Sequence, residues 1–215
     1  MSRKFASHVE RVRAISGSLS GRLFAFGGVR DDASLGSSIH VLSASKLTEQ
    51  ASLAVGSPVA ALCFLADDLL VAGGADGVLY GIEVADEKAV LRFSTPALAS
   101  AVTALARDDA GQRLVATTED GHVAVFALVV ESATPRLRPL GTRRVSARPL
   151  RAAAVEPGGR RLVVAGDDGN VRVLPLPSLT DDATSLQAAE LRDMPGNEAV
   201  YALVATDDGR VVAGA

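Results

Sequence analysis

Short apolar runs separated by tight turns follow one another along this chain, and residues 150–176 form the clearest copy of the pattern. In that copy a Pro-Gly-Gly turn at 157–159 precedes the apolar run 162–166, and an Asp-Asp-Gly-Asn turn at 167–170 precedes the run 171–174. Short apolar runs bounded by Gly, Pro, Asn and Asp are typical of strands. The pattern therefore predicts three short antiparallel strands joined by two tight turns.

The same template recurs along the chain, and each copy opens with an apolar run. The copies begin at Val12, Val59, Val102, Leu150 and Val200. Their spacing of roughly 43 to 50 residues is the period of a four-stranded propeller blade. Weaker strand candidates supply the outermost strand of each blade, and they are residues 3–9, 51–55, 89–93, 140–145 and 186–191. Residues 182–192 have one short helix as an alternative, because Ala, Leu, Gln and Glu favour that state.

The predicted fold class is all-β, a β-propeller built of four-stranded antiparallel blades, with about four full blades plus an incomplete one. One domain spans residues 1–215, and its hydrophobic fraction of 48% is ample for a core. A seven-bladed ring needs about 300 residues at this period, whereas the fifth copy stops at Ala215 before its third strand. We therefore expect a partial ring with an unpaired edge at Val211 and Val212. Another polypeptide or a second copy of the chain is expected to complete the ring.

An Asp-Gly pair between two apolar strands is a strong hairpin signal, because the turn needs positive φ angles that Asp and Gly tolerate. Such a pair stands at the same template position at 76–77, 120–121 and 168–169. Its recurrence predicts a tight hairpin turn between the second and third strands of three blades.

The repeats resemble WD40 repeats of a degenerate bacterial type, on the evidence of the stretches 72–77, 116–121 and 165–169 and the hydrophobic strand that follows each. The resemblance implies that Asp76, Asp120 and Asp168 bind backbone amides and rigidify their hairpins. It also places Leu42, Ile82, Phe126 and Leu174 at the family's Trp position. No Gly-His dipeptide precedes any inner strand, so the family's buried His–Ser/Thr–Trp–Asp network is not expected here.

Composition narrows the range of partners and compartments. The net charge is only -3, from 22 basic and 25 acidic residues. This charge does not favour nucleic acid or an anionic membrane surface as the default partner. Arg, Ala and Gly are abundant and Lys is rare, a bias that suggests a bacterium. The N-terminus has no apolar segment of a secretory signal, and Cys63 is the single cysteine, expected to be buried and inert. The expected compartment is the cytoplasm.

Catalytic and metal-binding motifs are weakly represented. Paired aspartates recur at 31–32, 67–68, 108–109, 167–168, 181–182 and 207–208. Such pairs suit Ca²⁺ binding or acid–base work, yet they fall in predicted turns, where Asp is favoured for bonding to the backbone. The three histidines are not paired at metal-ligand spacing, and no nucleophile elbow or phosphate loop is present. We expect no cofactor, no metal and no enzymatic activity.

Two features are candidates for partner binding. One is a cluster of arginines that a predicted outer strand and its flanking loops carry, comprising Arg136, Arg138, Arg143, Arg144 and Arg148, with Arg151, Arg160 and Arg161 close behind. A patch for an acidic protein surface and a solvated face balanced by acidic turns both fit it, and nucleic acid fits less well without aromatic stacking partners. The other candidate is the strand edge at Val211 and Val212. The polar insertion 29–38 is either a partner contact or a solvent loop.

The function expected from the sequence is a non-catalytic protein–protein interaction scaffold, a WD40-like subunit of a larger bacterial assembly. The alternative is a sensor or regulatory propeller that binds a small ligand in its channel, or a fragment of a propeller enzyme. Inner strands carry mainly Ala, Leu and Val, with Arg13, Thr103, Arg151 and Tyr201 as the few polar groups. That composition favours the scaffold.

Overall fold

The computed structural model describes residues 11–29, 37–85, 87–96, 98–177, 190–193, 198–206, 208 and 210–215. All regular structure in these ranges is β-strand, and no helix in them is long and apolar enough to cross a membrane. The strands are β1 (Arg11–Gly17), β2 (Leu23–Val29), β3 (Ser37–Ser43), β4 (Glu49–Val55), β5 (Val59–Phe64), β6 (Leu69–Gly74), β7 (Val78–Ala85), β8 (Lys88–Pro96), β9 (Val102–Arg107), β10 (Arg113–Thr118), β11 (His122–Glu131), β12 (Thr134–Arg144), β13 (Leu150–Val155), β14 (Arg161–Gly166), β15 (Asn170–Pro175), β16 (Glu190–Asp193), β17 (Ala202–Ala205) and β18 (Val211–Gly214).

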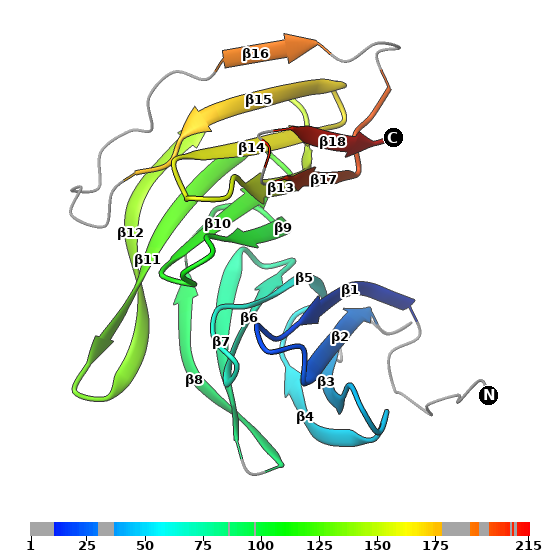
Figure 1. Cartoon of the computed structure of the whole chain (residues 1–215), viewed down its shortest axis with the longest axis vertical. Coiled ribbons are helices and arrows are strands. Elements are labelled where there is room, and N and C mark those ends of the chain that lie inside the picture. The colour runs from blue at the N-terminus through cyan, green and yellow to red at the C-terminus, as the bar shows by residue number, and fades with distance from the viewer. Residues whose placement is uncertain are drawn as a thin grey trace.

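The strands form a row of antiparallel sheets, each a simple meander. Four sheets have four strands, in the orders β1-β2-β3-β4, β5-β6-β7-β8, β9 to β12 and β13 to β16, and β17 pairs with β18 in a hairpin. The first strands of successive sheets pack against one another, from β1 through β5, β9 and β13 to β17. Figure 1 shows these inner strands gathered toward one centre, with β4, β8, β12 and β16 at the periphery. The all-β fold class with four-stranded blades is confirmed.

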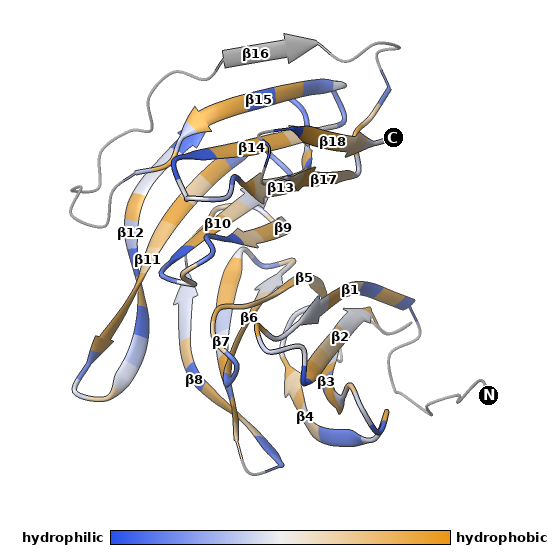
Figure 2. Ribbon diagram, in the orientation of Figure 1, coloured by the Kyte–Doolittle hydropathy of each residue, from blue (hydrophilic) through white to orange (hydrophobic). Residues whose placement is uncertain are grey.

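Apolar side chains between neighbouring sheets make the core. The second strands of the sheets inside the row are buried on both faces, because a sheet covers each of them on either side; all six residues of β6 are buried. This explains why its sequence is a continuous apolar run rather than an alternating one. Figure 2 shows the hydrophobic colour along β6, β7 and β14 and the hydrophilic colour at the turns. Burying each Val or Leu in such a strand contributes about 1.5–3 kcal/mol.

Close packing between sheets requires small residues. A Cβ atom on Gly73 would lie 2.4 Å from Cγ1 of Val102, which belongs to the next sheet. Cys63, in the neighbouring inner strand, is buried, and burial raises the pKa of its thiol to about 12. The thiol is therefore protonated and inert at neutral pH.

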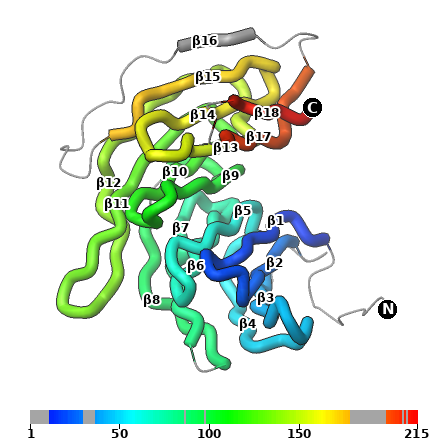
Figure 3. Tube along the Cα trace, viewed as in Figure 1, coloured from blue at the N-terminus to red at the C-terminus, as the bar shows by residue number. Residues whose placement is uncertain are grey.

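The first sheet and the β17–β18 hairpin are the two ends of the row. Figure 3 shows β1 and the β17–β18 hairpin facing each other across the open side of the arc. Ile15 on β1 is 69% exposed, and Val204 and Val212 on the hairpin are 57% and 59% exposed. These apolar side chains therefore lie on faces that, in the described structure, no sheet covers.

Several elements differ in extent from the prediction. The outer strand expected at 140–145 begins earlier, as β12 at Thr134, because the hairpin from β11 is longer than the template. The last copy, expected to begin its strand at Val200, does so at Ala202. Of residues 182–192, only 190–192 are described, as part of the strand β16, and the rest of the helix alternative lies outside the described residues. Most of the insertion 29–38 also lies outside them.

Candidate functional site

The inner strand of each four-stranded sheet contains a β-bulge near its start. In β1 the register shifts between Val12 and Ala14, so Arg13 has no direct partner on β2. Corresponding shifts leave out Ala60 in β5, Thr103 in β9 and Arg151 in β13. A bulge inserts one residue into a strand and redirects its side chain. The four bulged residues occupy the same position of the repeat.

These residues share one cavity of about 510 Å³, which is also lined by Tyr201, Arg11 and Val12. Tyr201 stands at the same repeat position, just before β17, and its amide donates to the carbonyl of Gly214. We call the five equivalent residues the bulge ring, and its members are Arg13, Ala60, Thr103, Arg151 and Tyr201. The sequence carries a signal for it, Val or Leu, then a variable residue, then Ala, at 12–14, 59–61, 102–104, 150–152 and 200–202.

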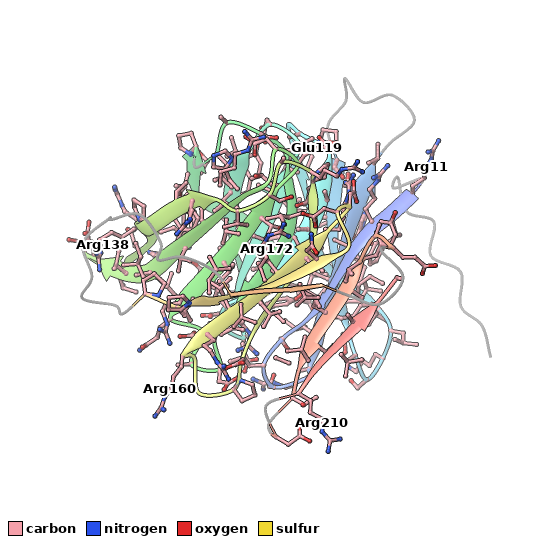
Figure 4. The ribbon with its side chains drawn as sticks, turned by 90° about the horizontal axis from the view of Figure 1, so that it is seen from above. Arg11, Glu119, Arg138, Arg160, Arg172 and Arg210 are labelled. Atoms are coloured by element: carbon pink, nitrogen blue, oxygen red, sulfur yellow. The ribbon has the colours of Figure 1, made fainter. Side chains whose placement is uncertain are left out.

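Of the three arginines that line this cavity, one is paired with a carboxylate and two form no ion pair with a described residue. The Arg151 guanidinium donates from Nε and Nη2 to the two carboxylate oxygens of Asp167, each at 2.8 Å. The hydrogen bond to Asp167 raises the pKa of Arg151, and the negative charge of Glu119 raises it further. Arg11 and Arg13 are exposed and form no ion pair with any described residue. Figure 4 places Arg11 and Glu119 at one rim of the molecule and Arg160 at the opposite rim.

The rim that carries Glu119 also holds the three Asp-Gly turns. Gly77, Gly121 and Gly169 have φ angles of 78°, 84° and 71°, as the hairpin prediction requires. A Cβ on Gly77 would lie 2.2 Å from the carbonyl oxygen of Leu98, so the next loop also excludes a side chain there.

The aspartates of these turns have different partners. Asp76 accepts from the amide of Val78 at 3.1 Å and from the Tyr80 hydroxyl at 2.5 Å. Burial raises the pKa of Tyr80, and the bond to Asp76 adds to it, to about 12. Asp120 accepts from the Thr118 hydroxyl at 2.5 Å and pairs with Nδ1 of His122 at 3.0 Å.

Asp168 has the most enclosed environment of the three. It accepts from the Ser146 hydroxyl at 3.0 Å, from the amide of Asn170 at 3.2 Å and from the guanidinium of the buried Arg172. Burial alone would raise the pKa of Asp168, but these hydrogen bonds outweigh burial and lower the pKa to about 2. The Asp168 carboxylate is therefore charged throughout the physiological range.

The arginine cluster is divided by the fold. Arg136, Arg138, Arg143 and Arg144 all lie on β12, an outer strand, and Arg148 is exposed in the loop that follows. Arg136 and Arg144 are exposed, whereas Arg138 and Arg143 are half-buried. Arg151 belongs instead to the bulge ring, and Arg161 pairs with Glu156 at 2.7 Å. The first five residues therefore form one outer band, and the others do not extend it.

The strand edge at the end of the row has two different sides. Val211 is half-buried and packs against the fourth sheet, beside Val163 and Val200. Val212 points the other way and directly opposes Val204 across the hairpin. Within the described part of the chain, no group of three His, Cys, Asp or Glu residues is arranged to hold a metal ion.

Known proteins resemble the chain in structure but not in sequence. No protein-family model matches it, and no curated protein does. The crystal structure of Sqt1 from Chaetomium thermophilum matches with a TM-score of 0.58 and 18% identity, over 97% of this chain and 67% of that one. Its complex with the N-terminus of the ribosomal protein L10 gives 0.60 and 19%, over 98% and 71%. The fold is that of a WD40-type propeller.

Proposed function

We propose that this protein is a non-catalytic protein–protein interaction scaffold, a WD40-like subunit of a larger bacterial assembly in the cytoplasm. Its main partner is another polypeptide that supplies further blades at the open side of the array. The observation that carries the proposal is the pair of uncovered apolar faces on β1 and on the β17–β18 hairpin.

These faces have the chemistry of blade interfaces. Ile15 directly opposes Phe26, so the two side chains share one face of the first sheet. Val204 and Val212 form a cross-strand pair on the other end of the row. Elsewhere in the described structure such apolar faces are covered by a neighbouring sheet. Exposed apolar patches and strand edges invite pairing with another chain.

A chain with further blades fits the opening better than a second copy does. Two copies would bring together eight four-stranded sheets and two hairpins, more than the four to eight blades usual in a propeller. The Sqt1 structures extend beyond the matched part, since this chain covers 67% and 71% of them. That one of them holds a segment of a ribosomal protein supports a protein ligand for this fold.

The outer band of Arg136, Arg138, Arg143, Arg144 and Arg148 is a second contact surface in this proposal. It lies on β12 and the loop beyond it, away from the core. Arg136, Arg144 and Arg148 expose their side chains there, and guanidinium groups recognise carboxylates well, so the band suits an acidic protein surface. A membrane has no part in this proposal, and nucleic acid is not the partner that the net charge of -3 favours.

The aspartates of the three Asp-Gly turns have a structural part in the scaffold. Asp76, Asp120 and Asp168 anchor their turns through the hydrogen bonds described above, and this keeps the rim rigid for binding. A rigid rim loses less conformational entropy when a partner docks.

Site-specific photo-crosslinking in the native host tests the scaffold proposal. A photo-reactive amino acid replaces Ile15, Val212 or Val90, the last being a matched control that is 42% exposed on the outer strand β8. Positions 15 and 212 are expected to give a crosslink to the same second protein, identified by mass spectrometry, and position 90 is not.

Three outcomes would overturn the proposal. Crosslinks at positions 15 and 212 that join only two copies of this chain would replace the second protein with self-association. No product at either position, or the same products at position 90, would show that the open side is not a specific contact.

A further inference from the structure

We propose that the bulge ring, together with Arg11, is a binding site for an acidic peptide segment of a protein partner. The site lies in the cavity of about 510 Å³ at the centre of the inner strands, and two of the elements that line it, β1 and the residue before β17, also border the open side of the array. A cavity of this size is within the range of ligand-binding clefts in proteins.

Positive charge that no described residue balances in an ion pair is the first observation. Arg11 and Arg13 come from the same strand, are exposed, and form no ion pair with any described residue. A carboxylate that binds them replaces no ion pair with a described residue. Guanidinium groups bind carboxylates through two parallel hydrogen bonds, which gives such a contact direction as well as charge.

The bulges are the second observation. A bulge recurs at the same repeat position of β1, β5, β9 and β13, and each bulged residue lines the cavity. Bulges redirect side chains and are concentrated at functional sites. Because the bulge recurs in four successive inner strands, the same local geometry lines most of the cavity.

Side-chain size around the ring is the third observation. Ala60 and Thr103 are small and leave room along one part of the wall, between Arg13 on one side and Arg151 on the other. Tyr201 is 62% exposed and offers an aromatic face with a hydroxyl at its tip. An extended peptide can lie over the small residues, with its carboxylates toward Arg11 and Arg13 and an apolar side chain against Tyr201.

Charge on the same wall argues for a peptide over nucleic acid. Asp167 already pairs with the Arg151 guanidinium, and the negative charge of Glu119 is near enough to raise the pKa of Arg151. A nucleic acid carries a charge on every nucleotide and would meet these carboxylates as well as the arginines. A peptide with a few carboxylates can place them beside Arg11 and Arg13 alone.

The positions of the cations also argue against a single small anion. Arg11 and Arg13 lie on β1, whereas Arg151 lies on β13 and already makes two hydrogen bonds to Asp167. The site therefore offers separate contacts along a wall, which a chain with several groups can use together.

Fluorescence anisotropy with labelled probes tests this site on the whole 215-residue chain. The probes are a peptide of alternating Glu and Ala, one of alternating Lys and Ala, and a single-stranded oligonucleotide of similar length. We expect the Glu peptide to bind with the highest affinity, and the binding to weaken as salt is added. Arg13→Glu should weaken it by roughly tenfold or more, since it reverses a charge at the contact, and Arg13→Lys should retain most of it.

Arg160→Glu is the matched control, because Arg160 is an exposed arginine at the opposite rim. It makes the same change in net charge and should alter the affinity by less than about twofold. Circular dichroism of every variant checks that the fold is retained. Tyr201→Ala, which changes no charge, should weaken the Glu peptide as well.

Several results would overturn the inference. One is an equal loss of affinity in Arg13→Glu and Arg160→Glu, and another is no binding of the Glu peptide at all. The others are an oligonucleotide that binds as tightly as the Glu peptide, and inorganic phosphate that displaces the Glu peptide when the two are present at equal total charge. None of them bears on the open side, because the crosslinks at Ile15 and Val212 do not depend on Arg13. The two proposals can therefore fail separately.

Discussion

The hairpin turns of the third and fourth sheets begin with the same Asp-Gly pair but secure it differently. In the fourth sheet Asp168 binds the guanidinium of Arg172, whose side chain is 9% exposed, and the hydroxyl of Ser146 from the preceding loop. In the third sheet Asp120 binds Thr118 and His122, and its side chain is 39% exposed. One turn rests on a buried ion pair, and the other on local bonds near solvent.

The difference shows that the turn is specified by its Asp-Gly pair and not by one fixed partner. Tyr80 and Arg172 stand four residues after their aspartates, whereas the partners of Asp120 stand two residues before and after it. In each hairpin the turn aspartate therefore binds whichever polar side chain the neighbouring positions provide. The cost of losing each partner should depend on its burial, which gives the following order of effects.

Removing the Arg172 guanidinium should have the largest effect. Arg172→Met keeps most of the side-chain volume but leaves Asp168 charged and largely buried without its cation. Breaking a buried pair in this way costs roughly 3 kcal/mol or more of unfolding free energy. Urea denaturation measures the loss, and the double variant Asp168→Asn with Arg172→Met should recover part of it. A loss no larger than that of an exposed surface variant would contradict the assigned burial.

The loss of stability in acid that Asp168 causes should be the next largest effect. The folded pKa of Asp168 is about 2, below its ordinary value of 3.8, so its carboxylate stabilises the fold above pH 4. That contribution is lost as the pH falls from about 4 to about 2, where the folded form also takes up the proton. The midpoint temperature of thermal unfolding, measured at a series of pH values, should therefore fall less steeply with acid in Asp168→Asn than in the natural chain. Parallel curves for the two proteins would show that Asp168 does not carry this dependence.

The exposed turn should give the smallest effect. Asp120→Asn keeps the shape of the side chain but weakens its bonds to Thr118 and His122, and we expect a loss of about 1 kcal/mol. Urea denaturation beside the Arg172→Met variant makes the comparison direct. A larger loss at Asp120 than at Arg172 would reverse the order and show that burial does not govern these turns.

Much of the fold follows from the sequence because it depends on local signals. Alternating apolar runs and the Asp-Gly pairs predict the strands and the hairpin turns, and Gly77, Gly121 and Gly169 have the positive φ angles that these turns need. The length of β12 was not predicted, because Pro135 and the arginines hide its pairing with β11 in the hydropathy pattern. Outer strands are the hardest to predict, because they lie at the periphery and their sequences carry a weaker apolar pattern.

The candidate site was harder to predict than the fold. The polar inner residues Arg13, Thr103, Arg151 and Tyr201 are visible in the sequence, each as the variable residue between Val or Leu and Ala, but nothing in that motif shows that the residue is bulged and faces a cavity. The sequence also did not indicate that the Arg172 guanidinium would pair with Asp168. Such long-range partners depend on how loops and strands meet in space.

The bulge has a consequence for how this molecule can change over generations. Because the bulged residue stands outside the strand ladder and faces the cavity, a mutation there leaves the apolar contacts between sheets untouched. The present set of Arg, Ala, Thr, Arg and Tyr shows that the position accepts very different side chains. Natural variation, or a library randomised at these five codons, can therefore alter what the protein recognises while the framework stays as it is.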